Sequence, residues 1–486
     1  MSEPLIRRIN REQMCWRAVD VERLIEEEHP ARAIWDLIGR LDLSRYYARI
    51  QCSEDEGGRP AIEPRLLISL WIYGYSLGIG SARELARRCQ WDPAFQWLTG
   101  CDEVNYHTLS SFRVEQREEL DDLFTQVLGL MSAEGLITLE QVVQDGTKIK
   151  AQASSTSFQG EARMQEHLER ARQRVREMGE PDQEAGASRV EQARWRAGRE
   201  RQERLERGLE ELQKRAASKP GEPTLRVSVT DPDARKMKQP DGGFAPSYNV
   251  QICADAAQSV IVDVQVTQAG NDSAQLLPGL ERIEARMGRK PLQMMADGDY
   301  TNRRSIEAMA EVGVDYLGSL RPSSEQRDMT GTGRLTTEVF LYDAQQDHYV
   351  CPQGMLLRYR GVKKKPSGVF RRYQAAAADC QSCPLKPQCC PGNQKHGRGL
   401  LRGEESAALN AFRQKMATRE AQQQYRARGR VIEFCHAWIK SKLGLRQFHL
   451  RGRIKAQIEA LWACLTYNLQ QWIRLSKQPT AASLSG

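Results

Sequence analysis

The sequence predicts an α/β fold in which helices flank a mixed β-sheet. Two apolar strands, VVQD and LQMMAD, each run into an aspartate, and between and after them strands alternate with helices. Successive strands followed by a strand–helix alternation are typical of a mixed sheet covered by helices. An all-α N-terminal domain, a charged helical hairpin insertion and a small β-rich insertion containing cysteines complete the predicted fold.

Residues 1–138 are predicted to form the helical domain. The run RLLISLWIYGYSLG predicts a buried helix, and Ser81 is a candidate N-cap for the helix SARELARRCQW. A further helical stretch, beginning at HTLSSFR, ends at Gly135. Arg83, Arg87 and Arg88 lie on one short helix, which favours a helix-turn-helix-like DNA reader. A helical packing domain explains the same pattern equally well.

Residues 160–216 are predicted to form a solvated helical hairpin. Its two arms are dense in Glu, Arg and Gln and are separated by EPDQEAGAS. Charge pairs spaced along a helix support such arms in water. A long coiled coil is disfavoured because sustained apolar a and d positions are missing.

Residues 139–159 and 217–325 are predicted to form the sheet and its covering helices. TLRVSVTDPDA predicts a strand, and SYNVQICADAAQSVIVDVQVTQAG predicts a strand hairpin. The helices NDSAQLLPGLERIEARMG and NRRSIEAMAEVG then alternate with the strands PLQMMADGDY and DYLGSL.

Residues 326–404 form the predicted β-rich insertion, 405–475 return to helix, and 476–486 form a tail. A CxxC motif with further cysteines on proline- and glycine-rich loops is typical of a structural zinc site. A reduced loop with incidental thiols is the alternative. The candidate zinc ligands are Cys351, Cys380, Cys383 and Cys389, and Cys390 could substitute for the last of them.

The charge of the chain is distributed unevenly. Residues 351–486 hold 25 Lys and Arg against 6 Asp and Glu, although the whole chain carries only +8. A basic C-terminal third on an acidic remainder indicates a surface for a polyanion, and we favour nucleic acid. The first residues lack the apolar segment of a secretory signal, and the longest apolar stretch is too short for a membrane span. These observations predict a cytoplasmic protein that does not bind membranes.

Asp145 and Asp297 are the first candidate ligands for a metal ion. Each closes an apolar run, so both are expected at strand ends of one sheet. Mg²⁺ takes oxygen ligands, and phosphoryl transfer uses such ions with open coordination positions. Asp299 is the rival for the second position, because on an extended strand it would share the face of Asp297.

Glu433 is the third candidate acid. It lies in RGRVIEFCHAWIKSKLG, where helical spacing places Arg430, Glu433 and Lys440 on one face. A surface ion-pair network would explain this pattern for an arbitrary helix. Its combination with two strand-end aspartates favours a catalytic triad whose basic neighbours hold phosphates.

These motifs together resemble the DDE transposases of bacterial insertion sequences, in the group with an InsH-type N-terminal domain. The N-terminal part of the resemblance runs through GRPAIEPRLLISLWIYGYSLGIGSARELARRC, FQWLTG and HTLSSFR. The catalytic part runs through QDGTKIKAQAS, TDPDARKMK, YNVQICAD, MMADGDY and IEFCHAWIKSKLGLRQFHLRG. The resemblance covers most of the chain except the charged hairpin.

The resemblance implies a ribonuclease-H-like core with the catalytic, Mg²⁺-binding triad Asp145, Asp297 and Glu433. Its tyrosine–arginine–glutamate–lysine signature maps onto Tyr425, Arg428, Glu433 and Lys440, with four residues between the arginine and the glutamate where the pattern has three. Arg430 is therefore a second candidate for the arginine. The chain also reads Asp297-Gly298-Asp299-Tyr300 where the family often has Asp-x-Gly-Tyr. The implied DNA-binding residues are Tyr425, Arg428, Arg430, Lys440 and Lys148.

The resemblance implies a transposase that binds the terminal inverted repeats of its element and target DNA, with residues 1–138 as the DNA-binding domain. Two Mg²⁺ ions would support cleavage and strand transfer, and a dimer or higher oligomer would form on the DNA. A DNA-binding relative that no longer cuts and a metal-dependent nuclease without strand transfer are the alternatives.

Overall fold

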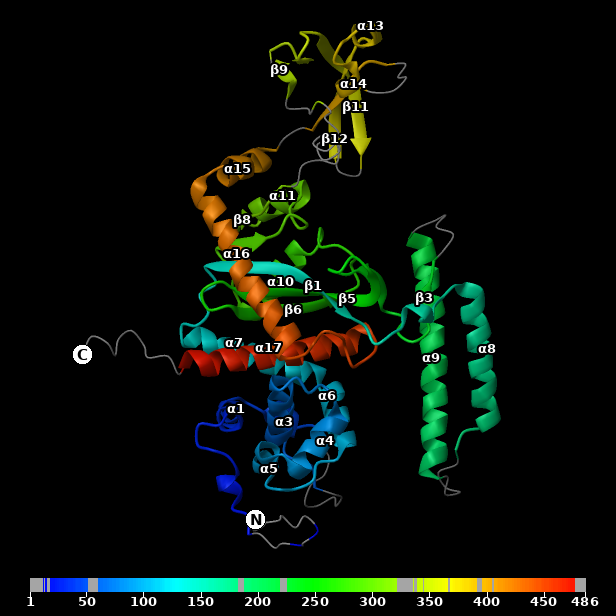
Figure 1. The fold of residues 1–486 in the computed structure, drawn as a ribbon, viewed down its shortest axis with the longest axis vertical. Helices are drawn as coiled ribbons and strands as arrows, with labels where there is room; N and C mark the ends of the chain where they lie inside the picture. Colours follow the sequence, from blue (N-terminus) through cyan, green and yellow to red (C-terminus); the bar gives the residue numbers. More distant parts are fainter. Residues whose placement is uncertain are drawn as a thin grey trace, which may run out of the picture.

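The computed structural model shows a tall molecule built from stacked parts (Figure 1). Helices of the N-terminal third lie below a central sheet, a second sheet lies above it, and a long helical hairpin stands to one side. The structure describes the chain apart from residues 1–11, 13, 15–17, 51–59, 182–187, 219–224, 321–334, 336–338, 344, 366–367, 391–395, 404–405 and 477–486. The predicted tail therefore lies almost wholly outside the described residues.

The N-terminal third is helical, as predicted. After a short 3₁₀ turn at Val21–Leu24 it contains α1 (Pro30–Gly39), α2 (Ser44–Tyr47), α3 (Pro64–Ser76), α4 (Ala82–Trp91), α5 (Pro93–Thr99), α6 (Tyr106–Glu115) and α7 (Arg117–Ala133). Ser81 caps α4, because its side chain accepts a hydrogen bond from the Glu84 N–H. The stretch beginning at HTLSSFR forms two helices, since the backbone leaves the helical region at Gln116.

The central sheet has the strand order β6-β5-β1-β7-β8, with β4 beside the start of β5. Its strands are β1 (Gln141–Lys150), β4 (Arg235–Lys238), β5 (Phe244–Asp255), β6 (Val260–Thr267), β7 (Gln293–Ala296) and β8 (Asp315–Leu317). β1, β5 and β6 pair in antiparallel fashion, whereas β7 and β8 run parallel to β1. Three antiparallel strands followed by two parallel ones across β1 are the ribonuclease-H-like topology, so the predicted fold class is confirmed.

Helices cover both faces of this sheet. Gln144 of β1 donates a hydrogen bond to the carbonyl of Gln275, which directly precedes α10 (Leu276–Met287), and α11 (Arg303–Glu311) connects β7 to β8. On the other face α16 (Arg419–Ala437) continues into a π-helical turn at Trp438–Lys442. α17 (Arg453–Ser476) lies along β6, where Asn468 hydrogen-bonds both the N–H and the carbonyl of Ile261.

α17 joins the sheet to the N-terminal helices. It lies between α3 and the sheet, and α7 packs beside it (Figure 1). Its Trp462 is buried and donates a hydrogen bond to the carbonyl of Arg113 in α6. The buried apolar residues of the N-terminal helices, the sheet and α15 to α17 consequently form one continuous core.

The charged insertion is a helical hairpin, as predicted, formed by α8 (Glu161–Met178) and α9 (Arg189–Ser218). A short ladder of β2 (Phe158–Gln159) with β3 (Val227–Ser228) closes its base. The apolar seam of the hairpin is small and consists of Met164, Leu168, Ala171, Leu205, Leu212 and Val227. Most other side chains of the two arms are polar, as expected for helices in water.

The second insertion, the insertion sheet, has the strand order β13-β12-β11-β10-β9. Its strands are β9 (Leu341–Asp343), β10 (His348–Val350), β11 (Leu356–Lys365), β12 (Gly368–Ala375) and β13 (Gly399–Gly403), with two short helices at α13 (Ala377–Gln381) and α14 (Lys386–Cys389). α15 (Ala407–Met416) then leads into α16. The sequence thus located the β-rich insertion and the helical C-terminus, while the functional division of the chain into domains stays a prediction.

Candidate active site

Asp145 lies in the middle of β1, which corrects the expectation that it ends a strand. The antiparallel partner β5 pairs with β1 from Val142 to Lys150, so the strand continues five residues beyond Asp145. The parallel partner β7 pairs only as far as Gln144, opposite Ala296. Asp145 and Asp297 are the next residues on these two parallel strands, and they therefore lie side by side where β7 ends.

The two carboxylates influence one another. Burial raises the pKa of Asp145 to about 6, and the negative charge of Asp297 adds to this shift. Asp145 Oδ1 accepts a hydrogen bond of 2.8 Å from the Gly146 N–H, and its side chain is 25% exposed. A buried carboxylate whose ionisation is disfavoured beside a second carboxylate forms a site that a cation would stabilise.

Asp299 does not lie on an extended strand, so the reason for treating it as a rival ligand is wrong. β7 ends at Ala296, and residues 298–300 form a turn. The Asp299 N–H donates a hydrogen bond of 2.8 Å to Asp297 Oδ1, which fixes the Asp297 carboxylate next to the strand end. The Asp299 side chain is exposed. The local geometry therefore favours Asp297.

Glu433 lies on α16, the helix that crosses the sheet on the Asp145 side, and its side chain is exposed. Its carboxylate lies back along its own helix, because Oε1 is 3.4 Å from where a Cβ of Gly429 would be. One turn further along, His436 Nδ1 is 3.8 Å from Asp145 Oδ2. Burial, with Lys440 nearby, lowers the pKa of His436 to about 3, so this contact joins a neutral imidazole to Asp145.

Three of the five predicted DNA-binding residues, Arg428, Tyr425 and Lys440, lie near Asp145. The guanidinium of Arg428 is close enough to lower the pKa of Asp145, and it stacks 5.2 Å above the ring of half-buried Tyr425. Arg428 Nε is buried and donates to no described atom. Lys440 is half-buried, and burial together with Arg446 lowers its pKa.

The other two predicted DNA-binding residues differ in their surroundings. Arg430 is exposed on α16. Lys148 is only 15% exposed, and its Nζ lies 3.7 Å from a carboxylate oxygen of Asp272. Lys148 is therefore held inside the molecule and is less available to DNA than Arg430.

Asp272 was missed by the sequence analysis. Its Oδ1 accepts hydrogen bonds of 2.6 Å from Asn249 and from Gln251, both of which are fully buried on β5. Gly146 leaves room for this carboxylate, because a Cβ there would lie 2.6 Å from Asp272 Oδ1. In the sequence Asp272 resembles an ordinary acid before a helix, and only tertiary contacts reveal its position behind Asp145.

Two of the residues at this site are suitable ligands for one divalent cation. Asp145 and Asp297 supply the hard carboxylate oxygens that Mg²⁺ prefers. Within the described parts of the chain, no three His, Cys, Asp or Glu side chains converge closely enough to hold a metal ion. The structure therefore brings two members of the predicted triad together and leaves Glu433 outside, so the triad stays a prediction.

The cysteines of the insertion sheet are grouped but do not surround a common point. Burial raises the pKa of the Cys380 thiol, and Cys390 and Cys383 are among its neighbours. Cys389 is buried beside Cys390 and Cys380, which raises its pKa to about 12. Cys351 packs against the same apolar cluster, where its Sγ accepts a hydrogen bond from the Met355 N–H.

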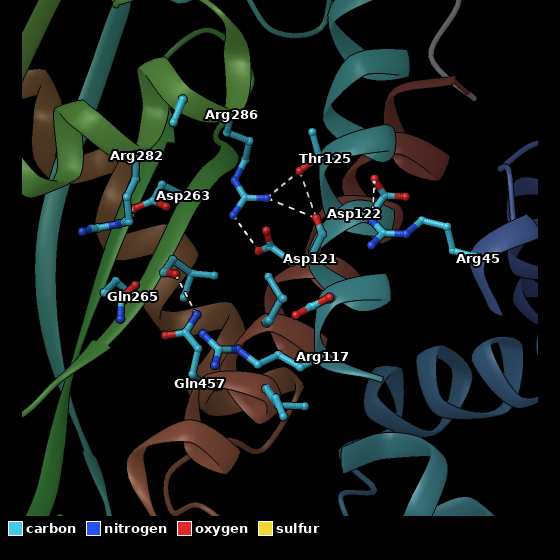
Figure 2. Close-up of a pocket in the computed structure, with 15 residues that line it drawn as sticks. Arg45, Arg117, Asp121, Asp122, Thr125, Asp263, Gln265, Arg282, Arg286 and Gln457 are labelled. Atoms are coloured by element: carbon cyan, nitrogen blue, oxygen red, sulfur yellow. Dashed lines mark hydrogen bonds and ion pairs between the residues drawn. The ribbon is translucent and has the colours of Figure 1, made fainter. Parts of the chain in front are cut away.

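A cavity of about 760 Å³ lies elsewhere, between α7, α10, β6 and α17 (Figure 2). Arginine–carboxylate pairs line it: Arg286 binds Asp121 at 2.7 Å, and Arg282 binds the fully buried Asp263 at 2.9 Å. None of the predicted site residues lines this cavity. Its ion pairs connect the N-terminal helices to the sheet, so we assign it a structural role.

The arginines of the predicted DNA reader are partly engaged. Arg87 pairs with Glu84, and Arg88 bridges Glu84 and Asp92. Arg83 stacks 5.1 Å from the ring centre of Tyr106 on α6. These contacts support the packing of α4 and leave both interpretations of the N-terminal helices open.

Two family models match the chain. "Transposase DDE domain" matches residues 350–473, which include Glu433 and Lys440, and "Transposase domain (DUF772)" matches residues 19–115. Asp145 and Asp297 lie outside both segments.

Within the described residues, no helix is both long and apolar enough to span a membrane.

Solved structures of transposases resemble the chain weakly. A pre-cleavage Mos1 transpososome is 11% identical, covers 56% of this chain and 64% of that chain, and gives a TM-score of 0.16. A piggyBac transposase synaptic complex with hairpin DNA is 8% identical, covers 96% of this chain and 83% of that chain, and gives a TM-score of 0.22. No curated protein matches the chain. The chain thus matches a transposase domain in its N-terminal part and the DDE domain of transposases in its C-terminal third.

Proposed function

We propose that the chain is the transposase of an insertion sequence, which binds the terminal inverted repeats and catalyses metal-dependent DNA cleavage and strand transfer. The observation that carries this proposal is the register of β1 and β7, which sets Asp145 beside Asp297. α16 crosses the same place with the cations of the predicted signature. Carboxylates surrounded by cations suit a phosphodiester, because the acids hold metal ions and the cations hold phosphate oxygens.

The residues of the chain have distinct roles in this reaction. Asp145 and Asp297, joined by Glu433 once DNA is bound, would hold the Mg²⁺ ions. When bound, such ions activate a hydroxyl nucleophile and stabilise the departing oxygen. The guanidinium of Arg428 and the ammonium of Lys440, on α16 and its π-helical continuation, would supply positive charge to a phosphate oxygen. His436, held neutral by burial, keeps Asp145 free of a competing ion pair.

One assay separates the proposed function from its alternatives. A labelled duplex carrying the terminal repeat is incubated with the protein and Mg²⁺, with a second unlabelled duplex as target. We expect cleavage at the repeat end and a joined product, both lost when EDTA replaces Mg²⁺. Cleavage without a joined product would identify a nuclease, and binding without cleavage would identify an inactive relative. The exposed position of Glu433 is the one observation that favours the inactive relative.

The N-terminal helices are the proposed end-recognition region. Exchanging residues 1–138 for those of a related transposase should change which terminal repeat is bound. Because these helices share one core with the sheet, an unchanged melting temperature is the control for this exchange. We propose that a dimer or higher oligomer forms in the DNA complex, because the two ends of the element must be held together.

We also propose that the cysteine group binds a structural zinc ion through Cys351, Cys380, Cys383 and Cys389, after a local rearrangement. Purified protein should then contain about one zinc per chain by elemental analysis. The double variant Cys380→Ser/Cys383→Ser should lose the zinc and melt at lower temperature, because the insertion sheet has only a small apolar core. Cys101→Ser, at an exposed cysteine outside the group, is the control. Fully folded wild-type protein without zinc would refute the site.

A further inference from the structure

The insertion sheet has two faces that differ in how their cations are used. Residues opposite one another in a β-ladder point to the same face. The register of β11 and β12 pairs Arg358 with Gln374 and Lys363 with Phe370, so Arg372 of β12 shares their face. The exposed residues Arg358, Lys363 and Arg372 are called the basic face below.

The opposite face is the core side of the insertion sheet. Arg371 lies there opposite Val362, forms an ion pair of 2.7 Å with Asp347 and stacks 4.8 Å from the ring centre of Tyr359. Arg402 of β13 stands beside Arg371, only 3.4 Å above the ring of Tyr342. Arg371 and Arg402 are therefore occupied by contacts within the protein.

The basic face has no such partners. Residues 348–378 contain seven Lys and Arg and no Asp or Glu. Arg372 donates a hydrogen bond to Gln374, and none of the three cations forms an ion pair with a described residue. The nearest carboxylate in the register is Asp343 on the edge strand β9, and it accepts hydrogen bonds from the N–H groups of Gln345 and Gln346.

The geometry of the ribbon suits a duplex. Four residues of β12 separate the partners of Arg358 and Lys363, which corresponds to roughly 14 Å at about 3.4 Å per residue. The major groove of B-DNA is about 12 Å wide and admits a two-stranded β-ribbon, so cations with this separation can reach phosphates on both of its sides. Strand pairing fixes the separation before DNA arrives, which reduces the entropy lost on binding.

We propose that the basic face of the insertion sheet docks onto the phosphate backbone of duplex DNA and forms a contact separate from the one at Asp145. This inference rests on the proposed function, because it takes DNA as the partner of the chain. Seven of the 25 Lys and Arg of residues 351–486 lie on this β-ribbon, which stands apart from the core sheet (Figure 1).

The test compares two triple variants of the full-length protein that carry the same change in net charge. The basic-face variant is Arg358→Gln/Lys363→Gln/Arg372→Gln, and the control is Lys364→Gln/Arg371→Gln/Arg402→Gln on the opposite face. Affinity for a non-specific duplex is measured between 50 and 200 mM salt. Each lost phosphate contact removes about 0.9 from the log–log slope of affinity against salt. Raising the salt across this range should therefore weaken DNA binding by the basic-face variant about 40-fold less than it weakens binding by the wild-type protein.

The control should keep the wild-type slope. Because Arg371 and Arg402 also support the insertion sheet, the single variants Lys363→Gln and Lys364→Gln provide a second comparison. These neighbours on one strand point to opposite faces, and only Lys363→Gln should flatten the slope, by about 0.9. Equal slopes for the two single variants would overturn the proposal. Tighter binding of single-stranded than of duplex DNA, with the same face dependence, would overturn the assignment to duplex.

The same samples enter the cleavage assay, which keeps the two proposals distinguishable. A face-dependent slope in a protein that never cuts would support the docking surface and refute the transposase function. Normal cleavage, with equal slopes for the variants of the two faces, would support the transposase function and refute the docking surface.

Discussion

Asp145→Ala should abolish Mg²⁺-dependent cleavage and leave DNA binding intact. The side chain lies beside Asp297 where β7 ends, and in the described structure neither a Lys nor an Arg forms an ion pair with it. Removing one carboxylate from a metal-binding pair removes the electrostatic stabilisation of the reacting phosphate, which is worth about 10²–10³-fold in rate or more. Asp297→Ala should have the same effect. Both are measured as nicking of a labelled terminal repeat beside a binding assay on the same samples.

The fold should tolerate the change at Asp145. Burial raises the pKa of this carboxyl to about 6, which means that the folded protein disfavours the ionised form. A neutral Asn of the same shape therefore removes an unfavourable charge, and Asp145→Asn should melt at or slightly above the wild-type temperature at pH 7. Asp299→Ala is the matched control, since this exposed acid lies two residues from Asp297. Lost cleavage in Asp299→Ala with normal cleavage in Asp297→Ala would assign the second position to Asp299.

Local sequence patterns predicted the elements that carry the site but not the end of β1. The buried residues Val142, Val143 and Gln144 precede Asp145 because the parallel pairing with β7 stops at Gln144. The strand itself continues, since β5 supplies hydrogen-bonding partners as far as Lys150. A partner strand that lies about a hundred residues away along the chain is not visible in a local pattern. The prediction was thus wrong about the strand end, and the convergence of the two acids on a metal ion stays a prediction.

Residues whose role depends on several distant segments were not predictable. Asp272 lies behind Asp145 only because Asn249 and Gln251 of β5 hold its carboxylate and Gly146 leaves space for it. The sequence shows none of these contacts. By contrast, the helical spacing of α16 was sufficient to place Glu433 and Lys440 on the helix that crosses the site. Spacing along one element is local information, whereas convergence of side chains from three elements is not.

Glu459 allows the third acid to be tested against a matched acid of the same chain. It lies one helix after Glu433, on α17, and is fully buried. Its carboxylate accepts hydrogen bonds from the N–H groups of His449 and Leu450 and contacts His449 Nδ1 at 2.7 Å. Glu459 thereby holds the turn before α17. Glu459→Ala should cost about 3 kcal/mol of unfolding free energy, because it leaves buried backbone donors without a partner.

Glu433→Ala should have the opposite effect: it should leave the stability of the fold unchanged and reduce cleavage. Its exposed side chain contributes little to packing, so the melting temperature should stay within a degree or two of wild type. DNA binding should stay equal or tighten slightly, since one negative charge leaves a basic surface. Cleavage should fall by about 10²–10³-fold or more, as for Asp145→Ala, if Glu433 turns toward the two aspartates when DNA is bound.

The two glutamates are separated by measuring melting, binding and nicking on the same samples. A loss of nicking that follows the loss of folded protein, as expected for Glu459→Ala, indicates a structural role. A loss of nicking in fully folded, DNA-bound Glu433→Ala indicates a role in the reaction. Normal cutting by Glu433→Ala, together with a folded and DNA-bound Glu459→Ala that does not cut, would show that the third member of the triad is wrong. The exposed carboxylate on α16 would then be one charge among the cations that face the DNA.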